Sequence, residues 1–527
     1  MKDLGLLGRL IDYLCHLGFL ALMELTRSEV GILVASGVVV AFLVQRWRRM
    51  TLLQRCGIPG PRPHFITGNM KECFSIPNVV FDSNLINTYG PICGYYLGAK
   101  PIILISDPEI LKLIEIEQAK NFRNRPRRVP GGISPDPKRT EMLGNLPHEE
   151  WSETRKVLSR AFTPAKLKEM VPQIKDKVDI FMKKVVEGEM DFYPLLQGLT
   201  LDIIGQTGFG VECHIQENIN DPLHLAVQAE FAKSPSSWLV KGYLCFSEFT
   251  WLLQPFRVAL YKLQEHLGWA ESSELWDTGF STFHKRTVEN SPRRPDILQQ
   301  LLDSHLSANP LRVVANSVLF FEAAYETLSS SLAFIIHLLV KHEEVQELVR
   351  EELAAVLGDK GGELDEVVEQ NDLRKLKYLD MVVKEGLRLF PPQTTFIGRF
   401  GDTAVTVRKD GKEYIIPPGV HVQAGLYQLH HSSEHWEDPE QFRPERFLDP
   451  NVNSGKWQAF GLGPRICIGQ SFAWIVLKLV LGNLLAMYML SPGPNFENEI
   501  SIRYKIATMT PAKGSFAVVK KQPLTEY

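Results

Sequence analysis

A glycine-rich stretch near the C-terminus constrains this chain more than any other segment. Residues 460–469 have the sequence Phe-Gly-Leu-Gly-Pro-Arg-Ile-Cys-Ile-Gly. Glycine and proline at this density do not continue a regular helix or strand, so we expect a tight, irregular loop. The apolar residues behind it predict a long helix that ends at about Leu490. The one cysteine of the loop, Cys467, therefore lies at the N-terminal end of a helix.

This position favours a thiolate at Cys467. A helix N-terminus offers free backbone N–H groups and the positive end of the helix dipole, and both stabilise the ionised sulfur. A thiolate held in this way is a strong ligand for heme iron. Phe460 can pack beside the sulfur and limit solvent access, and Arg465 can pair with a heme propionate because guanidinium suits a carboxylate. The alternative is a buried structural cysteine, which is the usual environment of a lone cysteine.

Composition places few other limits on function. The chain has 527 residues, a formal net charge of −3 and 44% apolar residues, which is enough to bury a sizeable core. This charge balance does not indicate nucleic acid as a partner. The seven cysteines are scattered singly, without a C-x-x-C pair. That spacing argues against a disulfide-stapled secreted protein and favours a reducing compartment.

The N-terminal residues have the character of a membrane anchor. Residues 30–44 are an unbroken run of apolar and small residues. The run is short beside the roughly 20 residues of a full span, but tilt or the flanking Trp47 can extend its reach. A cleaved signal peptide is the alternative, although the run starts far from Met1 and no small-residue cleavage site follows. We expect residues 1–55 to form an anchor and basic linker, with the body on the cytoplasmic side because of the arginines that follow the run: Arg46, Arg48, Arg49 and Arg55.

Residues 56–527 are expected to form one domain, mainly α with a smaller β portion. A hairpin is predicted from strands at 92–97 and 102–105, and further strands at 404–408 and 414–416. Long helical patterns cover 315–349 and 378–390. The aromatic-rich segment 231–261 is either core packing or the lining of an apolar ligand channel.

Four motifs together resemble the cytochrome P-450 superfamily. Residues 460–469 match F-x-x-G-x-R-x-C-x-G at every fixed position, and residues 385–388, 444–447 and 151–155 match E-x-x-R, P-E-R-F and W-x-x-x-R. The resemblance extends from about residue 59 to residue 520. Residues 89–98 and 162–172 are most similar to the microsomal branch that holds the drug- and steroid-oxidising family 3 enzymes and thromboxane synthase.

The resemblance implies a cytochrome P-450 fold around heme b, with Cys467 as the ligand of the iron. It implies a structural ion-pair network of Glu385, Arg388 and Arg446 behind the heme loop. It also implies a set of propionate-binding residues beside Arg465. Arg399 belongs to this set one position later than the family pattern predicts. The other members are Trp151, Arg155 and Arg125.

Residues 323–327 resemble the helix I motif [AG]-G-x-[DE]-T, which crosses the distal face of the heme. The resemblance implies that Thr327 relays a proton during oxygen activation and that Glu326 supplies it. Ala324 replaces the usual Gly and Leu328 replaces the next Thr or Ser. The alternative is an ordinary core helix in which Thr327 bonds to its own backbone.

Substrate-facing residues are implied only by position in the family, and they indicate an apolar ligand of lipid or steroid type. They are Phe320, Phe321, Ala323, Thr394, Thr395, Phe396, Ala507 and Thr508.

The leading hypothesis is a monooxygenase that inserts one atom of O₂ into an apolar organic substrate. The chain has no convincing nucleotide or flavin module of its own, so an NADPH-dependent cytochrome P-450 reductase is the expected partner, with cytochrome b5 as a further one. The expected location is the endoplasmic reticulum membrane, as a single-pass protein. A peroxide isomerase resembling thromboxane synthase is the second hypothesis, and a non-catalytic heme protein that binds a small ligand is the third. The helix I threonine favours the first.

Overall fold

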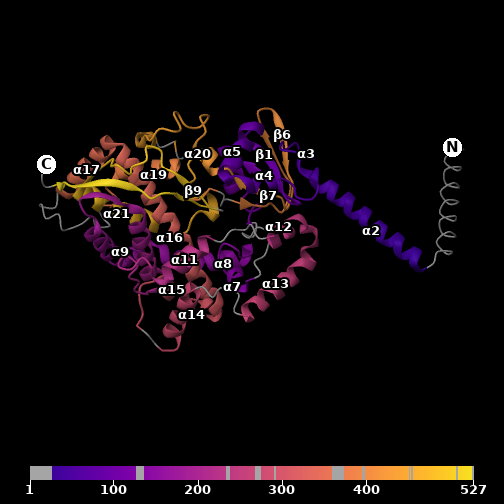
Figure 1. Ribbon diagram of the computed structural model, residues 1–527, viewed down its shortest axis with the longest axis horizontal. Helices are drawn as coiled ribbons and strands as arrows, with labels where there is room; N and C mark the ends of the chain where they lie inside the picture. The colour runs from indigo at the N-terminus through magenta and orange to yellow at the C-terminus, as the bar shows by residue number, and fades with distance from the viewer. Residues whose placement is uncertain are drawn as a thin grey trace.

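The computed structural model describes residues 27–125, 136–232, 238–267, 274–289, 292–358, 373–394, 398–449, 452, 455–505 and 508–524. The predicted class is confirmed, because the described chain is mainly helical with a smaller strand portion (Figure 1). The helices are α2 (Arg27–Met50), α3 (Leu52–Arg55), α4 (Met70–Ser75), α5 (Asn78–Tyr89), α6 (Pro108–Lys112), α7 (Pro137–Thr140), α8 (His148–Leu158), α9 (Pro164–Lys184), α10 (Phe192–Ile204), α11 (Pro222–Ala232), α12 (Trp238–Cys245), α13 (Thr250–His266), α14 (Glu274–Thr287), α15 (Ile297–Leu302), α16 (Pro310–Lys341), α17 (Glu343–Gly358), α19 (Lys377–Leu389), α20 (Leu426–His430) and α21 (Gln470–Met487). The strands are β1 (Ile92–Leu97), β2 (Lys100–Ile105), β3 (Gly188–Asp191), β4 (Gly398–Arg399), β5 (Val405–Lys409), β6 (Lys412–Ile416), β7 (His421–Ala424), β8 (Tyr488–Ser491), β9 (Ile502–Tyr504), β10 (Met509–Pro511) and β11 (Phe516–Lys521).

Helix α2 projects away from the body (Figure 1). It is longer than the predicted apolar run, because the basic residues behind the run continue the helix. Among the described helices, α2, α16 and α21 are long and apolar enough to cross a membrane. The apolar windows of α16 and α21 are 83% and 67% buried inside the protein, against 6% for α2. Helix α2 is therefore the candidate anchor.

A buried arginine joins α2 to the body. The guanidinium of Arg46 donates to the carbonyl oxygens of Phe65, Ile66 and Cys245 at 2.9, 2.6 and 2.6 Å. It also forms an ion pair with Glu248 at 2.9 Å. Further along the chain, Met50 and Leu53 belong to a buried cluster with Ile58. The predicted boundary near residue 55 thus falls within a packed unit.

The predicted hairpin is confirmed by β1 and β2, which pair antiparallel with Ile92 opposite Ile105. They continue into a sheet of order β1-β2-β7-β4, in which β2 and β7 are parallel. Strands β5 and β6 form a separate antiparallel pair at the other two predicted positions. Strand β4 carries Arg399 to the edge of the larger sheet.

Helix α16 runs through the centre of the protein and packs against α10, α14, α19 and α21. The prediction of one helix over residues 315–349 is wrong, because the chain breaks at His342 and continues as α17. The side chain of Gln346 donates to the carbonyl oxygen of Leu339 at 2.7 Å. The first turn of α17 bonds to the carbonyl oxygen of His342. These contacts satisfy both helix ends at the break.

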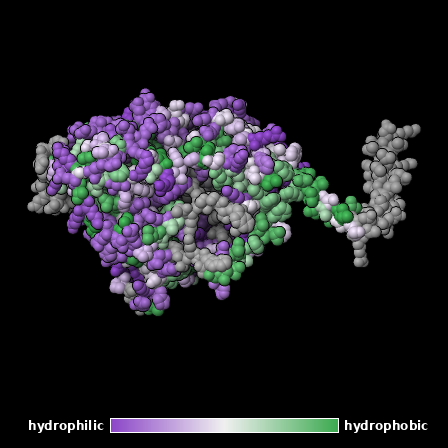
Figure 2. All heavy atoms as spheres, in the orientation of Figure 1, coloured by the Kyte–Doolittle hydropathy of each residue, from purple (hydrophilic) through white to green (hydrophobic). Residues whose placement is uncertain are grey.

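The aromatic-rich segment 231–261 is divided between core and surface. Tyr243 near the end of α12 is 3% exposed, whereas Trp251 and Phe256 of α13 are 73% and 61% exposed. Figure 2 shows hydrophobic atoms over α2 and over the adjoining edge of the body. Phe231 alone among the described aromatic residues of the segment lines the cavity around Cys467.

Candidate active site

One cavity brings together most of the predicted site residues, which come from widely separated segments. Its walls are built by α8, α16, the segment after α19, the loop before α21 and the turn between β9 and β10. The predicted residues that line it are Arg125, Trp151, Arg155, Phe320, Ala323, Thr327, Arg399, Phe460, Arg465, Cys467 and Thr508.

Cys467 is held by an irregular loop, as predicted. Its backbone N–H donates to the carbonyl oxygen of Phe460 at 2.9 Å. Gly461 and Gly463 have φ angles of +75° and +67°, which side chains disfavour. A Cβ at Gly463 would also collide with the backbone oxygen of Glu115. The loop thereby presents the sulfur to the cavity.

Two opposing effects act on the pKa of the Cys467 thiol. Burial raises the pKa of the thiol above its ordinary value. The backbone N–H groups of Gly469 and Gln470 and the charges of Arg155 and Arg125 lower it, but by less. A metal cation bound at the sulfur would lower the pKa of the thiol further, because metal coordination deprotonates a thiol.

Arg465 has buried donors that need an acceptor. Its Nη2 donates to the carbonyl oxygen of Arg123 at 2.7 Å. Its Nε and Nη1 are buried and have no hydrogen-bond partner among the residues that the structure describes. The guanidinium carbon lies 3.7 Å from the centre of the Trp151 ring, and that of Arg155 lies 5.6 Å from the same ring.

Three more arginines surround Arg465. Arg155 donates to the carbonyl oxygen of Ile466 at 2.7 Å, and Arg125 to that of Arg465 at 3.2 Å. Arg399 is buried and contacts Glu115 at 3.6 Å. Arg399 therefore lies in the site, although it stands one position later in the sequence than the family pattern predicts.

The electrostatics of this cluster call for an anion. Burial lowers the pKa of Arg155 and Arg399, and lowers that of Arg465 to about 9, aided by the nearby charges of Arg399 and Arg155. Glu115 is a buried acid in the same place, and desolvation raises its pKa to about 7. The cluster, with the orphaned donors of Arg465, fits the two carboxylates of heme. The sequence analysis missed Glu115, whose only signal is a charge within an apolar run.

Thr327 lines the cavity from α16. Its hydroxyl donates to the carbonyl oxygen of Ala323 at 2.7 Å. A hydrogen bond from Thr327 to the backbone of its own helix was the expected alternative to a proton relay. The two descriptions are compatible, because a hydroxyl that donates to the backbone still offers lone pairs to a group in the cavity.

Glu326 is not poised beside Thr327 as expected. It is 1% exposed, forms an ion pair with Lys505 and accepts a hydrogen bond from the Thr508 hydroxyl at 2.5 Å. Glu326 is absent from the described cavity lining, whereas Lys505 is part of it. Sequence reasoning missed Lys505, because an isolated lysine near the C-terminus does not reveal which helix it faces.

Some of the predicted substrate-facing residues line the cavity, others point away from it, and others lie outside the described residues. Phe320 and Ala323 line the cavity, but Phe321 does not: its ring lies 4.8 Å from that of Phe209 in the core. Neighbours on a helix point about 100° apart, so one of the two phenylalanines is turned away. Thr394 is buried, and Pro392 and Gln393 form the described wall there. Three predicted residues lie outside the described ones: Thr395, Phe396 and Ala507.

A further charged group on the wall was not predicted. Arg139, at the end of α7, forms ion pairs with Glu230 and with Glu322, the second at 3.3 Å. All three side chains line the cavity. The wall is therefore less apolar than its phenylalanines and leucines indicated.

The structural network assembles as the resemblance implied. Arg388 forms a two-pronged contact with Glu385 at 2.7 and 2.8 Å, and Arg446 contacts the same carboxylate at 2.9 Å. Arg388 also donates to the carbonyl oxygen of His430 at 2.7 Å. Glu385 and Arg388 are fully buried and line neither the cavity nor its mouth.

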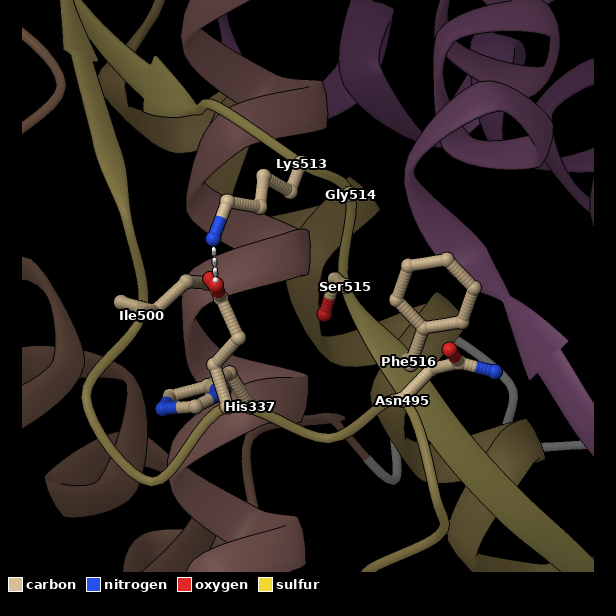
Figure 3. Close-up of a pocket in the computed structure, with 8 residues that line it drawn as sticks. His337, Asn495, Ile500, Lys513, Gly514, Ser515 and Phe516 are labelled. Carbon is tan, nitrogen blue, oxygen red and sulfur yellow. Dashed lines mark hydrogen bonds and ion pairs between the residues drawn. The ribbon is translucent and has the colours of Figure 1, made fainter.

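A second cavity lies between α16 and the C-terminal strands (Figure 3). Lys513 forms an ion pair with Glu497 at 2.6 Å across it. The ring of His337 stacks on Phe496 at 4.8 Å, and burial lowers its pKa to about 4. This cavity shares no described lining residue with the one around Cys467, so it is separate from the candidate active site.

Comparison with known proteins agrees with this geometry. Residues 58–517 match the profile of the family described as Cytochrome P450. Cytochrome P450 3A6 of Oryctolagus cuniculus is 32% identical over 87% of this chain and 90% of its own length. Lithocholate 6-beta-hydroxylase of Mesocricetus auratus is 30% identical over 91% and 94%, and Cytochrome P450 3A5 of Homo sapiens 30% identical over 88% and 91%. The chain therefore belongs to the cytochrome P450 family and is a heme monooxygenase of that family.

Proposed function

We propose that this chain inserts one oxygen atom of O₂ into an apolar or amphipathic organic substrate, a steroid, lipid or xenobiotic. The second oxygen atom leaves as water, and two electrons come from NADPH through a separate reductase. One observation carries the proposal: the Cys467 sulfur, the orphaned donors of Arg465 and the hydroxyl of Thr327 open onto the same cavity. The sulfur ligand, the donors for a carboxylate and the proton carrier then line one cavity.

The position of each residue in the cavity indicates its role. Cys467 binds the iron of heme b, and Arg125, Arg155, Arg399 and Arg465 hold the propionates. Heme bound here supplies an iron centre that activates O₂ once it has received electrons. The Thr327 hydroxyl, which lines the cavity and rests on the carbonyl of Ala323, would donate its proton to the reacting group and regain one from water in the cavity.

Substrate class follows from the walls and from a relative. Six apolar side chains contribute to the lining of the cavity: Leu143, Leu158, Phe162, Phe231, Leu319 and Phe320. The relative from Mesocricetus auratus is named for hydroxylation of lithocholate. A substrate with a ring or chain skeleton of similar apolar character fits these walls.

The proposed location is the endoplasmic reticulum membrane, with residues 56–527 as the cytoplasmic catalytic domain. Support comes from the exposed apolar surface of α2 and from the basic residues Arg48 and Arg49 at its end. Cytochrome P-450 reductase and cytochrome b5 would approach from the same side, and lipid would contact α2.

A peroxide isomerase is the second candidate, because Glu326 is occupied by Lys505 and does not face the cavity. Such an enzyme needs neither electrons nor a proton supply. The test is reconstitution of the heme-loaded protein with a microsomal reductase and with steroids, fatty acids or a prostaglandin endoperoxide, each with and without NADPH. Product that requires both NADPH and O₂ is the expected result. Product from the endoperoxide alone, unchanged by NADPH, would transfer the protein to the isomerase class.

A further inference from the structure

The distal wall of the active-site cavity carries an ammonium group that the oxidation reaction does not require. Lys505 lines the cavity, and its side chain is 25% exposed there. Its Nζ pairs with Glu326 and lies 5.5 Å from the centre of the Phe231 ring. The ring face attracts the ammonium group and Glu326 balances its charge, so the cation is held at the cavity wall.

Lys505 has donors to spare. An ammonium group carries three N–H donors. Among the residues that the structure describes, the carboxylate of Glu326 is the one acceptor for Nζ. Two donors therefore remain for a group inside the cavity.

The position of this ammonium is fixed by its surroundings. The backbone N–H of Lys505 donates to the carbonyl oxygen of Thr508 at 2.8 Å, which links the residue after β9 to the residue before β10. The hydroxyl of Thr508 donates to Glu326 at 2.5 Å, so the carboxylate is held from two sides. The lysine is thus tied to the wall and does not extend into bulk solvent.

The same cavity already contains a cation between two carboxylates. Arg139 contacts both Glu230 and Glu322. Lys505 contacts one carboxylate and also lines the cavity. The ligand that completes this arrangement has an anionic oxygen group at one end and an apolar body that follows the leucine and phenylalanine walls.

We propose that Lys505 is a specificity-determining residue that binds the carboxylate of an amphipathic substrate, with the apolar body of that substrate directed toward Cys467. The proposal rests on the proposed function for the identity of the cavity. It adds a charged end to a substrate that the walls alone would describe as apolar.

The test compares dodecanoate with its methyl ester, which has the same chain without the charge. Equilibrium dialysis against the full-length, heme-loaded protein in lipid nanodiscs at about pH 8 keeps the carboxylate ionised. The ratio of the two dissociation constants is the readout, because partition into the bilayer cancels when variants are compared. The variants are Lys505→Met, which removes the charge, and Lys505→Arg, which retains it. Lys513→Met is the matched control, since it removes a lysine–glutamate pair in the second cavity (Figure 3).

We expect native protein, Lys505→Arg and Lys513→Met to bind dodecanoate at least ~10-fold more tightly than the ester, as a charge-assisted contact provides. We expect Lys505→Met to bring the ratio to about one. A native ratio near one, or a preference that survives Lys505→Met, would overturn the proposal. Dialysis against nanodiscs without protein gives the lipid partition of each ligand, and after this is subtracted the native ratio decides even if a variant fails to fold. Dialysis needs no turnover, so the subsite can stand if oxidation fails, and it can fail while NADPH-dependent oxidation proceeds.

Discussion

The guanidinium group of Arg465 lies against the indole ring of Trp151, with its central carbon 3.7 Å from the ring centre. Arg155 approaches the same ring at 5.6 Å. The ring therefore gathers the buried Arg465 and the half-buried Arg155 beside Cys467, and its attraction for them offsets part of their mutual repulsion. This contact joins α8 to the loop before α21.

Trp151→Ala should weaken the retention of heme. A desolvated cation–π contact contributes about 2 kcal/mol, so heme should leave up to ~30-fold faster when Arg465 loses the ring. The rate of heme transfer to a competing acceptor protein measures this. Trp151→Phe keeps a ring and should stay within a few-fold of the native rate. Equal rates for the alanine variant and native protein would show that the ring does not position Arg465.

Glu115→Gln should alter the pH dependence of stability. Desolvation raises the pKa of Glu115 from 4.5 to about 7 in the folded protein. Its contribution to stability is complete below the unfolded value and is lost as pH rises through the folded value. The stability of Glu115→Gln relative to native protein should therefore increase between about pH 5 and pH 8, by up to about 3 kcal/mol. Thermal unfolding at several pH values measures this, with Glu117→Gln, at an exposed neighbouring position, as the control variant.

Glu385→Gln should destabilise the fold strongly. Its carboxylate is fully buried between Arg388 and Arg446, and removal of one partner leaves buried charge without compensation. We expect a loss of about 3–5 kcal/mol in the free energy of unfolding. The exposed pair Arg408–Glu413 gives the control, because Glu413→Gln should cost no more than about 0.5 kcal/mol. Similar unfolding midpoints for the two variants would contradict a structural role for the buried pair.

Arg46→Gln should loosen the junction between α2 and the body. The substitution removes an ion pair and several hydrogen bonds to buried backbone oxygens. Amide hydrogen exchange should rise at residues 65–66 and 245–248, and a protease should cut there more readily. Arg48→Gln changes an exposed arginine on the same helix and should leave exchange unchanged. Protection that persists in Arg46→Gln would mean that other contacts hold the junction.

Thr327→Val should uncouple NADPH consumption from product formation. The substitution keeps the shape of the side chain and removes the hydroxyl that faces the cavity. We expect product formation to fall about 100-fold, which is typical for loss of a proton carrier, while NADPH consumption continues. Product formed per NADPH consumed is the measurement, and Thr327→Ser should retain most of it. An unchanged ratio in the valine variant would remove Thr327 from the mechanism.

The sequence by itself determined the features that depend on neighbours along the chain. The loop around Cys467, the β1–β2 hairpin and the pairing of Glu385 with Arg388 all follow from short spacings, because local spacing fixes which side chains share a face. The motif set also indicated the heme-binding arginines, although only packing showed that Arg399 reaches the site despite its shifted position.

The tertiary structure decided which charges meet across the cavity. Lys505 pairs with Glu326, Glu115 lies beside Arg399, and Phe321 turns away while Phe320 faces the site. Helical spacing requires only that one of the two phenylalanines turns away; which of them does so, and which charges pair, depends on how segments far apart in the chain pack. Burial then changes the chemistry: desolvation raises the pKa of Cys467 beyond what its helix end lowers. Local sequence sets geometry over a few residues, whereas desolvation and long-range charge pairing exist only after the chain has folded.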